Sequence, residues 1–283
     1  MVSLFAVSIP QEGYAARRGY DGCSESNSMC SRIQDLGEEA EDEFPHPILL
    51  DVEADDLSDT WGDARSSGNT HEGTDIHAPR GALVVMPVDG VVDRTGVSGL
   101  GGNHVFVYIA GGEKLYFAHL DEWAEGLSDG DILDKGDLVG YVGNTGAEYT
   151  SPHLHFAIYK DGVADNPFPR MEDEDWTLKQ KMNSLDSILD DADDDGELAQ
   201  ELYKNYRALF DEADRKDVRL PSEIQKIIDN ADELAEELAS ELIDELEKTV
   251  EDALEDQVDE QAVQDSNTER AKLFDTFEVD LSL

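Results

Sequence analysis

The chain has 283 residues, of which 67 are acidic and 21 basic, so its formal net charge is −46. Nucleic-acid binding through phosphates needs a basic footprint, which this charge excludes. Hydrophobic residues make up 39% of the chain, enough to bury a core in one or two domains, and no apolar run approaches the ~20 residues that span a bilayer.

This charge also predicts how the protein responds to salt. A chain so acidic repels itself in dilute buffer, and that repulsion is screened when ~1 M salt shortens the Debye length to ~3 Å. We therefore expect a halophilic protein. The alternative is that only the C-terminal region is functionally acidic and the rest of the chain follows it.

Residues 1–45 mix Gly, Ser, Asp and Glu without hydrophobic periodicity, which predicts a flexible acidic arm. Its first apolar stretch is short, and arginines follow rather than precede it, which is not typical of a secretion signal. Cys23 and Cys30 lie seven positions apart, and this spacing fits either a short-loop disulfide or two free thiols.

Residues 46–171 predict an antiparallel β domain. Short runs of β-branched and aromatic residues recur about every ten residues and are separated by Gly-rich turns. The alternation of apolar and polar residues predicts strands with one buried face. The runs are LVVMP, GVVDR, HVFVYIA, KLYFAHL, DLVGYVG and HLHFAIY.

Residues 172–283 predict an acidic, all-helical region, so the expected fold class is α+β. Two shorter helices are expected at 178–189 and 198–210. From Pro221 or Ser222 onward, apolar residues recur at steps of three and four between Ile224 and Val258, which predicts one long amphipathic helix. Its apolar stripe packs on the other helices, on the β domain or on a partner, so helix-mediated association through 221–260 is left open.

The segment DDADDDGELAQEL in this region resembles a calcium-binding loop only superficially. A loop starting at Asp191 places Gly196 at position 6 but Leu202 at position 12, where the motif needs Glu. A loop starting at Asp190 recovers Glu201 and loses the glycine. We interpret the segment as a solvated turn between helices.

The histidines carry the chemistry, because all seven lie between positions 46 and 155. His71 and Asp75 stand four apart in HEGTD, and His153 and His155 stand two apart in HLHFAIY, so each pair shares a face if its segment is extended. His119 ends the run LYFAHL. Two imidazoles and a carboxylate form the three-ligand set of catalytic zinc sites, and two further histidines can move protons.

These blocks resemble the lysostaphin (LytM) type of zinc metallopeptidase. HEGTDIHAPRG, GGNHVFVYI, YFAHL, KGDLVGYVGNTG, PHLHFAIY and DNPFP follow one another in the order found in that family. The resemblance covers about 125 residues and leaves both flanking regions unexplained. It implies that His71, Asp75 and His155 bind zinc and that His119 and His153 form the catalytic pair. His77 and His104 are extra histidines, interpreted as surface or packing residues, and Asn103 as a fold-supporting residue.

The resemblance implies a zinc endopeptidase that hydrolyses peptide cross-bridges of bacterial cell walls. That substrate class suggests the cell envelope or the extracellular space, whereas the weak secretion signal fits a cytoplasmic or virus-encoded enzyme equally well. Two alternatives remain: a non-catalytic domain of the same fold that activates another wall hydrolase, and an interaction protein acting through its acidic helices.

Overall fold

The computed structural model describes residues 28–65, 68–192, 196–231, 239–240, 242–243, 246, 248 and 269–270. The chain divides into two compact units, residues 1–223 and 224–283. The boundary expected between residues 171 and 172 therefore falls inside the first unit.

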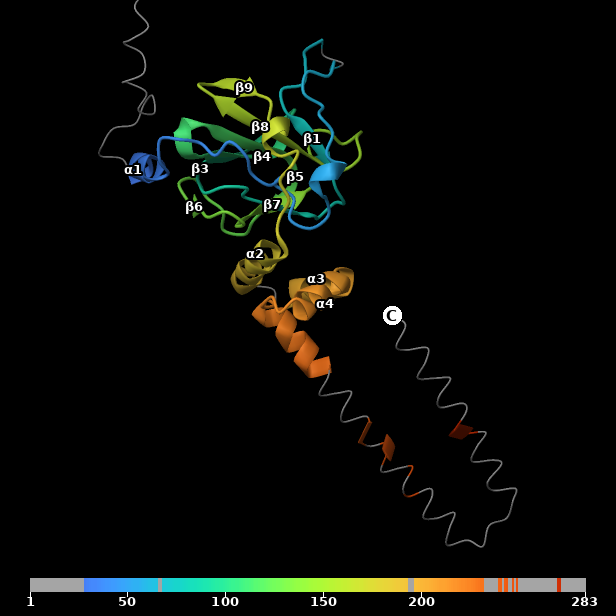
Figure 1. Cartoon of the computed structure of the whole chain (residues 1–283). Coiled ribbons are helices and arrows are strands. Elements are labelled where there is room, and N and C mark those ends of the chain that lie inside the picture. Colours follow the sequence, from blue (N-terminus) through green and yellow to red (C-terminus); the bar gives the residue numbers. More distant parts are fainter. Residues whose placement is uncertain are drawn as a thin grey trace, which may run out of the picture. The chain divides into compact units, whose positions relative to one another are not determined.

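An antiparallel sheet forms the body of the first unit (Figure 1). Its main path runs β1-β8-β5-β4-β3-β6, while β7 pairs with β2 and β5, and β9 pairs with β8. The strands are β1 (Thr74–His77), β2 (Leu83–Val85), β3 (Gly90–Ser98), β4 (Gly102–Tyr108), β5 (Lys114–Trp123), β6 (Ile132–Leu133), β7 (Leu138–Val142), β8 (His153–Lys160) and β9 (Val163–Asp165).

Each of the six expected runs contains a strand. Successive side chains of a strand point to opposite faces of the sheet, so buried and exposed residues alternate. On β5, Leu115 and Phe117 are fully buried while Tyr116 between them is half-buried. On β8, Phe156 is buried and contacts Phe117 with ring centroids 5.3 Å apart. One face therefore packs into the core, and the predicted α+β class is confirmed.

The N-terminal segment differs from the expected flexible arm. Helix α1 (Ser28–Asp35) lies inside it, and its Cys30 and Ile33 are buried. Further along, Phe44 is buried in the core, and its backbone N–H donates to the Arg170 carbonyl at 2.9 Å. The segment is thus folded from residue 28, because its apolar residues cover the sheet. Cys30 is disulfide-bonded.

Three helices follow the sheet: α2 (Leu178–Asp191), α3 (Glu197–Asn205) and α4 (Arg207–Arg215). Helix α2 starts at a capping box in which Thr177 and Gln180 bond reciprocally, so its start matches the expectation. The single helix expected over 198–210 is wrong. Tyr206 leaves the helical region at φ −121° and ψ 28°, and its hydroxyl donates to Asp51 at 2.6 Å, so the chain turns there. Short 3-10 turns occur at Ala54–Asp56, Ala110–Gly112 and Phe168–Arg170.

Helices α2–α4 and the residues just before them contact residues 46–53, which precede the sheet, and the turn between β6 and β7. Gly136, at φ +100°, passes so close to Ser184 of α2 that a Cβ would collide with the serine hydroxyl. Burial of Trp176, Met182 and Leu185 adds an apolar contact layer. Polar contacts join Trp176 Nε1 to the His46 carbonyl at 2.8 Å, Lys181 Nζ to Glu53 Oε1 at 3.0 Å, and Tyr206 to Asp51.

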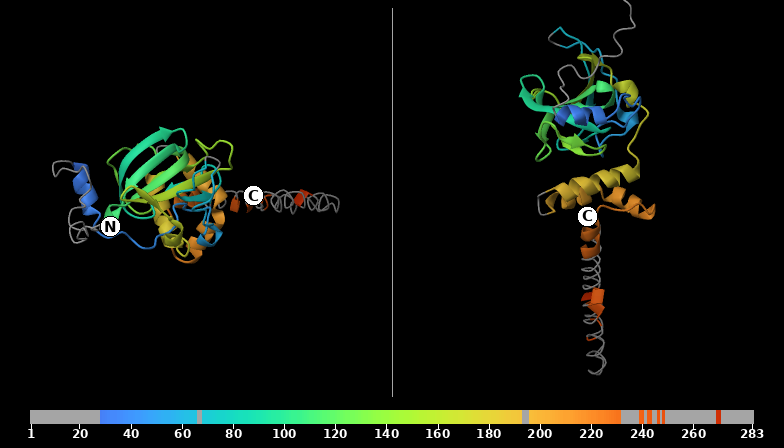
Figure 2. Two further views of the ribbon diagram at one scale, coloured as in Figure 1. Left: turned by 90° about the horizontal axis from the view of Figure 1, so that it is seen from above. Right: turned by 90° about the vertical axis from the view of Figure 1, so that its left-hand side faces the viewer.

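In the second unit, residues 224–231 are helical, as expected for the start of the long helix. Most of the apolar stripe up to Val258, and residues 193–195 of the rejected calcium loop, lie outside the described residues. Within the described residues, no helix is both long and apolar enough to cross a membrane. Figure 2 gives two further views of the sheet and of helices α2–α4.

Candidate metal centre

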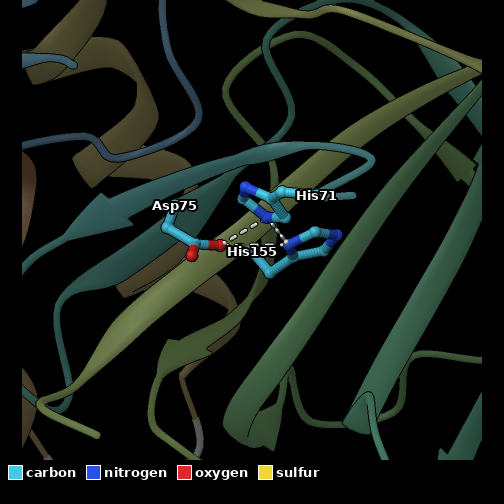
Figure 3. A group of neighbouring side chains, drawn as sticks. All are labelled: His71, Asp75 and His155. Carbon is cyan, nitrogen blue, oxygen red and sulfur yellow. Dashed lines mark hydrogen bonds and ion pairs between the residues drawn. The ribbon is translucent and has the colours of Figure 1, made fainter. Parts of the chain in front are cut away.

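Pairing of β1 with β8 brings three metal-ligand side chains together. Asp75 of β1 lies directly opposite His155 of β8 in the antiparallel register. His71 precedes β1, and its Nε2 lies 2.8 Å from His155 Nδ1 and 3.0 Å from Asp75 Oδ1. Asp75 Oδ1 in turn lies 3.0 Å from His155 Nδ1. Figure 3 shows the three side chains pointing toward one another.

The segment from His71 to Asp75 is not extended throughout, which was the condition under which the spacing would put both side chains on one face. The chain bends at Gly73, where a Cβ would stand 2.6 Å from His155 Cε1 and 2.7 Å from the Phe156 carbonyl oxygen. Because glycine lacks that atom, the segment passes directly over β8. His71, which is only 4% exposed, can therefore reach the same point as the two strand residues.

The loop before β1 orients two of these side chains. His71 Nδ1 lies 2.7 Å from the Thr60 carbonyl, so Nδ1–H donates there and Nε2 keeps its lone pair for a metal. Thr60 Oγ1 also accepts the backbone N–H of Asp75 at 2.9 Å. On the far side of the carboxylate, Arg65 Nη2 donates to Asp75 Oδ2 at 2.6 Å. One loop thus fixes the tautomer of the imidazole and the rotation of the carboxylate.

The protonation state of Asp75 suits a ligand. Burial acts to raise the pKa of this carboxyl, but polar contacts with His155, His71 and Arg65 outweigh burial and hold the pKa well below its usual range. The carboxylate is therefore ionised at neutral pH.

The three donor atoms fit a small divalent ion. Zinc sits ~2.0–2.2 Å from nitrogen and oxygen ligands in a tetrahedron, which requires donors roughly 3.3 Å apart. The observed separations of 2.8–3.0 Å need only a small outward shift to reach that spacing. Two imidazole nitrogens and one carboxylate oxygen are a donor set typical of catalytic zinc sites, in which the fourth position is left for water.

Two further histidines face this centre. His153 is buried, and its Nε2 lies 4.0 Å from Asp75 Oδ1. His119 lies beside it, with ring centroids 4.8 Å apart. Their Nδ1 atoms lie 2.9 Å from the carbonyls of Ser151 and Thr145. Both rings therefore carry the proton on Nδ1 and leave Nε2 as an acceptor.

Burial determines the charge of these two rings. It lowers the pKa of His119 to about 4 and lowers the pKa of His153 below its ordinary value. Hydrogen bonds to the two carbonyls act in the opposite direction but are weaker. At neutral pH both imidazoles are neutral, so each can accept a proton.

Backbone geometry at His119 aims its side chain. The residue adopts φ +63°, a left-handed conformation that is uncommon for a non-glycine residue. Here the β4–β5 pairing shifts register between Asn103 and Val105, and the His119 N–H donates to the Gly101 carbonyl at 2.9 Å. The bulge turns the imidazole toward His153, and bulges commonly re-aim side chains next to active sites.

The extra residues take the positions expected of them. His77 is exposed at the end of β1, and His104 is buried with Nδ1 3.0 Å from the Gly102 carbonyl. Asn103 donates to the Asp121 carbonyl at 2.8 Å, and its N–H donates to Thr145 Oγ1. Asn103 therefore supports the loop whose Thr145 carbonyl holds His119. Sequence reasoning missed Arg65, because an arginine ten residues before a ligand has no diagnostic spacing.

Comparison with known proteins identifies this region. The model of Peptidase family M23 matches residues 69–167. The L-Ala–D-Glu endopeptidase of Bacillus subtilis (strain 168) is 40% identical over 149 residues, covering 48% of this chain and 44% of that protein. The peptidoglycan DD-endopeptidase ShyC of Vibrio cholerae is 31% identical over 97 residues, covering 34% of this chain and 22% of that protein. This chain thus spans less than half the length of either relative.

Among solved structures, a putative glycyl-glycine endopeptidase LytM from Ruminococcus gnavus is 33% identical. It covers 50% of this chain and 63% of its own, with a TM-score of 0.39.

The antiparallel sheet and the convergent His–Asp–His set define a metallopeptidase-type domain. Residues 69–167 match the model of peptidase family M23, and the matching relatives named above are peptidoglycan endopeptidases by name. The resemblance inferred from the sequence is therefore confirmed.

Proposed function

We propose that this protein is a zinc metalloendopeptidase that cleaves peptides of bacterial peptidoglycan. One observation carries the proposal: His71, Asp75 and His155 place three donor atoms within 3.0 Å of one another, and two neutral histidines face them. The domain boundaries of the catalytic part, the metal and the residue roles are all part of this proposal.

The ligand roles follow from the donor set. His71 Nε2, Asp75 Oδ1 and His155 Nδ1 hold the ion, and Arg65 keeps Asp75 Oδ2 turned away from it. Zinc at such a centre polarises the scissile carbonyl and lowers the pKa of water to about 7.

His153 and His119 handle protons. Because Nδ1 of each ring donates to a carbonyl, Nε2 is the atom available to a nucleophilic water or to the substrate. The His119 ring lies 5.9 Å from the His155 ring, and His153 Nε2 lies 4.0 Å from Asp75 Oδ1. We assign His153 the first proton transfer: its Nε2 takes a proton from the attacking water and later gives that proton to the leaving amine nitrogen. The neutral His119 orients the water by accepting a hydrogen bond at its Nε2.

The substrate class comes from the relatives. Two of the curated relatives are, by name, an L-Ala–D-Glu endopeptidase and a peptidoglycan DD-endopeptidase. The first is the more similar at 40% identity, so the L-Ala–D-Glu bond is the first one to test.

The test measures zinc and cleavage on the same preparation. The full chain is dialysed, its zinc content is determined, and release of new amino termini from purified peptidoglycan is followed with and without a chelator at 0.1 M and 2 M salt. We expect about one zinc per chain and cleavage that the chelator abolishes and zinc restores. Arg219→Gln, which alters an 81% exposed arginine on the segment after α4, serves as the control. A protein that binds wall material stoichiometrically with zinc but releases no termini would instead be a non-catalytic binding module.

A further inference from the structure

Beside the metal centre, the solvent-facing side of the sheet carries a row of aromatic rings. Phe106 of β4, Tyr116 of β5 and Tyr159 of β8 are half-buried and alternate with core residues along their strands. Phe106 and Tyr116 are direct partners in the antiparallel register. We call these three residues the aromatic platform.

The platform is continuous with the metal centre. Tyr116 contacts the ligand His155 with ring centroids 5.9 Å apart, and Phe106 stacks beside Tyr116 at 4.3 Å. The ring centroid of Tyr159 lies 5.9 Å from that of Phe106 and 6.2 Å from that of Tyr116. A substrate extending from the metal along this face meets an uncharged, largely apolar surface.

Arg94 lies at the far side of the platform. Its guanidinium carbon stands 4.3 Å from the centroid of the Phe106 ring, in the geometry of a cation–π contact. Arg94 lies on β3 opposite Phe106, and its side chain is exposed. Stacking on a ring fixes the guanidinium plane and leaves its edge N–H groups facing outward.

This arginine is conspicuous because the chain holds 67 acidic residues against 21 basic ones. Its neighbour Lys114, on the same side of the sheet, is paired with Asp93 at 2.8 Å. Among the described residues, no carboxylate lies within ion-pair distance of Arg94. A guanidinium that the described part of the chain leaves without an acid is available to an acid from outside.

The distance from Arg94 to the metal centre determines how long a peptide must be to contact both. Three strand-to-strand steps, β8 to β5 to β4 to β3, separate His155 from Arg94. At ~4.8 Å for each step, the span is roughly 14 Å. An extended peptide covers ~3.3–3.6 Å per residue, so this span corresponds to about four residues.

We propose that Arg94 and the aromatic platform form a subsite for a carboxylate-bearing residue of an extended peptide, about four residues from the bond cleaved at the metal centre. The inference rests on the proposed peptidase function and adds substrate specificity to it. The platform supplies apolar contact area, and Arg94 supplies charge-assisted hydrogen bonds in a planar fork. Aromatic rings on a sheet also stack on nucleic-acid bases, but the net charge of −46 opposes a polyanion.

The test uses pairs of peptides built around one L-Ala–D-Glu bond. Within each pair, a single position three, four or five residues from that bond is Glu in one peptide and Gln in the other, on either side of the bond. We measure kcat and KM for the full-length wild type, for Arg94→Gln, and for Arg219→Gln. The last variant removes the same charge from an 81% exposed arginine on the segment after α4.

For the wild type we expect a KM about tenfold lower for the Glu peptide than for its Gln partner when the substitution is near position four, with similar kcat. That factor is the lower end of what a hydrogen bond to a charged group contributes. Arg94→Gln should raise the KM of the Glu peptide to that of its Gln partner and so remove the preference, whereas Arg219→Gln should keep it. Equal KM values for both peptides of every pair in the wild type would overturn the subsite.

A binding measurement separates this inference from the proposed function. Calorimetric titration of zinc-loaded His153→Ala protein with the same peptides, with and without Arg94→Gln, reports affinity without turnover. If the wild type cleaves no peptide but the titration still shows an Arg94-dependent preference for Glu, the subsite stands and the peptidase proposal fails. If cleavage occurs and neither method shows a preference, the peptidase stands and the subsite fails. Preferential binding of single-stranded DNA over the Glu peptides would also overturn it.

Discussion

The Arg65 guanidinium donates to Oδ2 of Asp75 at 2.6 Å, while Oδ1 of the same carboxylate faces His71 and His155 at 3.0 Å. Arg65 and the metal centre thus share one carboxylate. The arginine comes from the loop before β1, and its side chain is 42% exposed, whereas the Asp75 side chain is 13% exposed. An exposed arginine therefore sets the rotation of a sheltered carboxylate, the one proposed as a metal ligand.

Arg65→Gln should weaken zinc binding. Partners behind a ligand typically account for a ~10–100-fold difference in metal affinity. We expect a loss near the lower end of that range, because Thr60 still anchors the Asp75 backbone and the His71 ring. Competition with a chromogenic chelator measures the affinity, and Arg219→Gln supplies the control for a lost positive charge. Unchanged affinity would mean that Arg65 has no role in holding the ligand.

His153 and His155 are two residues apart on β8 but have different expected roles. His155→Ala removes one of three donors, so zinc and activity should be lost together. His153→Ala should keep stoichiometric zinc while activity falls ~100-fold or more, the usual scale for an acid–base group. His119→Ala should behave like His153→Ala, and His77→Ala should change little. Metal analysis of dialysed variants, together with the cleavage assay, tests which histidines bind zinc and which transfer protons. Loss of zinc from His153→Ala with retention by His155→Ala would reverse it.

A buried histidine far from the metal predicts acid sensitivity. Burial lowers the pKa of His46 from 6.5 to about 4, against a weaker opposing effect of Asp175. The unfolded chain therefore binds this proton first, so stability is complete above pH 6.5 and is lost as pH falls toward 4. The shift is equivalent to about 3 kcal/mol. Denaturant unfolding of the wild type and of His46→Gln between pH 7 and 4 should show a shallower pH dependence in the variant. If the free energy of unfolding of both proteins changed equally with pH, His46 would not be the cause of the acid sensitivity.

The strands and the five site residues were predictable because both depend on local spacing. Alternation along HLHFAIY fixes which face of β8 is buried, and the ordered motif blocks identify His71, Asp75, His119, His153 and His155 as a set. The roles of these residues stay predictions until the variants are measured.

Other features depend on contacts between segments far apart in the chain, which no local pattern reveals. Tyr206 ends α3 because its hydroxyl reaches Asp51, although helical periodicity continues through it. Arg65 acquires its role only because its loop folds back over β1. Helix α1 forms in a segment of polar composition because Cys30 and Ile33 find an apolar surface.

The net charge of −46 predicts that salt stabilises the fold. The Debye length falls from ~10 Å at 0.1 M to ~3 Å at 1 M, so repulsion between acidic side chains should be largely screened by ~1 M. We expect the melting temperature to rise over this range and then to change more slowly up to ~2 M. Scanning calorimetry in NaCl, with sucrose at matched osmolarity as control, separates screening from general exclusion effects. A melting temperature that stays flat or falls in NaCl would argue against halophilic adaptation.

Helices α2–α4 should be required for the stability of the sheet, in contrast to the boundary expected at residue 171. Trp176 and Leu185 are buried, and the Trp176 indole donates to the carbonyl of the buried His46. Each large apolar side chain that loses its buried environment costs ~1.5–3 kcal/mol, and such losses approach the whole stability of a typical domain. A chain ending at residue 223 should keep cooperative unfolding, zinc and cleavage, because it retains the entire first compact unit. A chain ending at residue 171 should unfold at least ~10 °C lower or lose its near-ultraviolet circular dichroism. If both truncated chains have the same melting temperature as the full chain, the catalytic domain ends at residue 171 and α2–α4 only cover it.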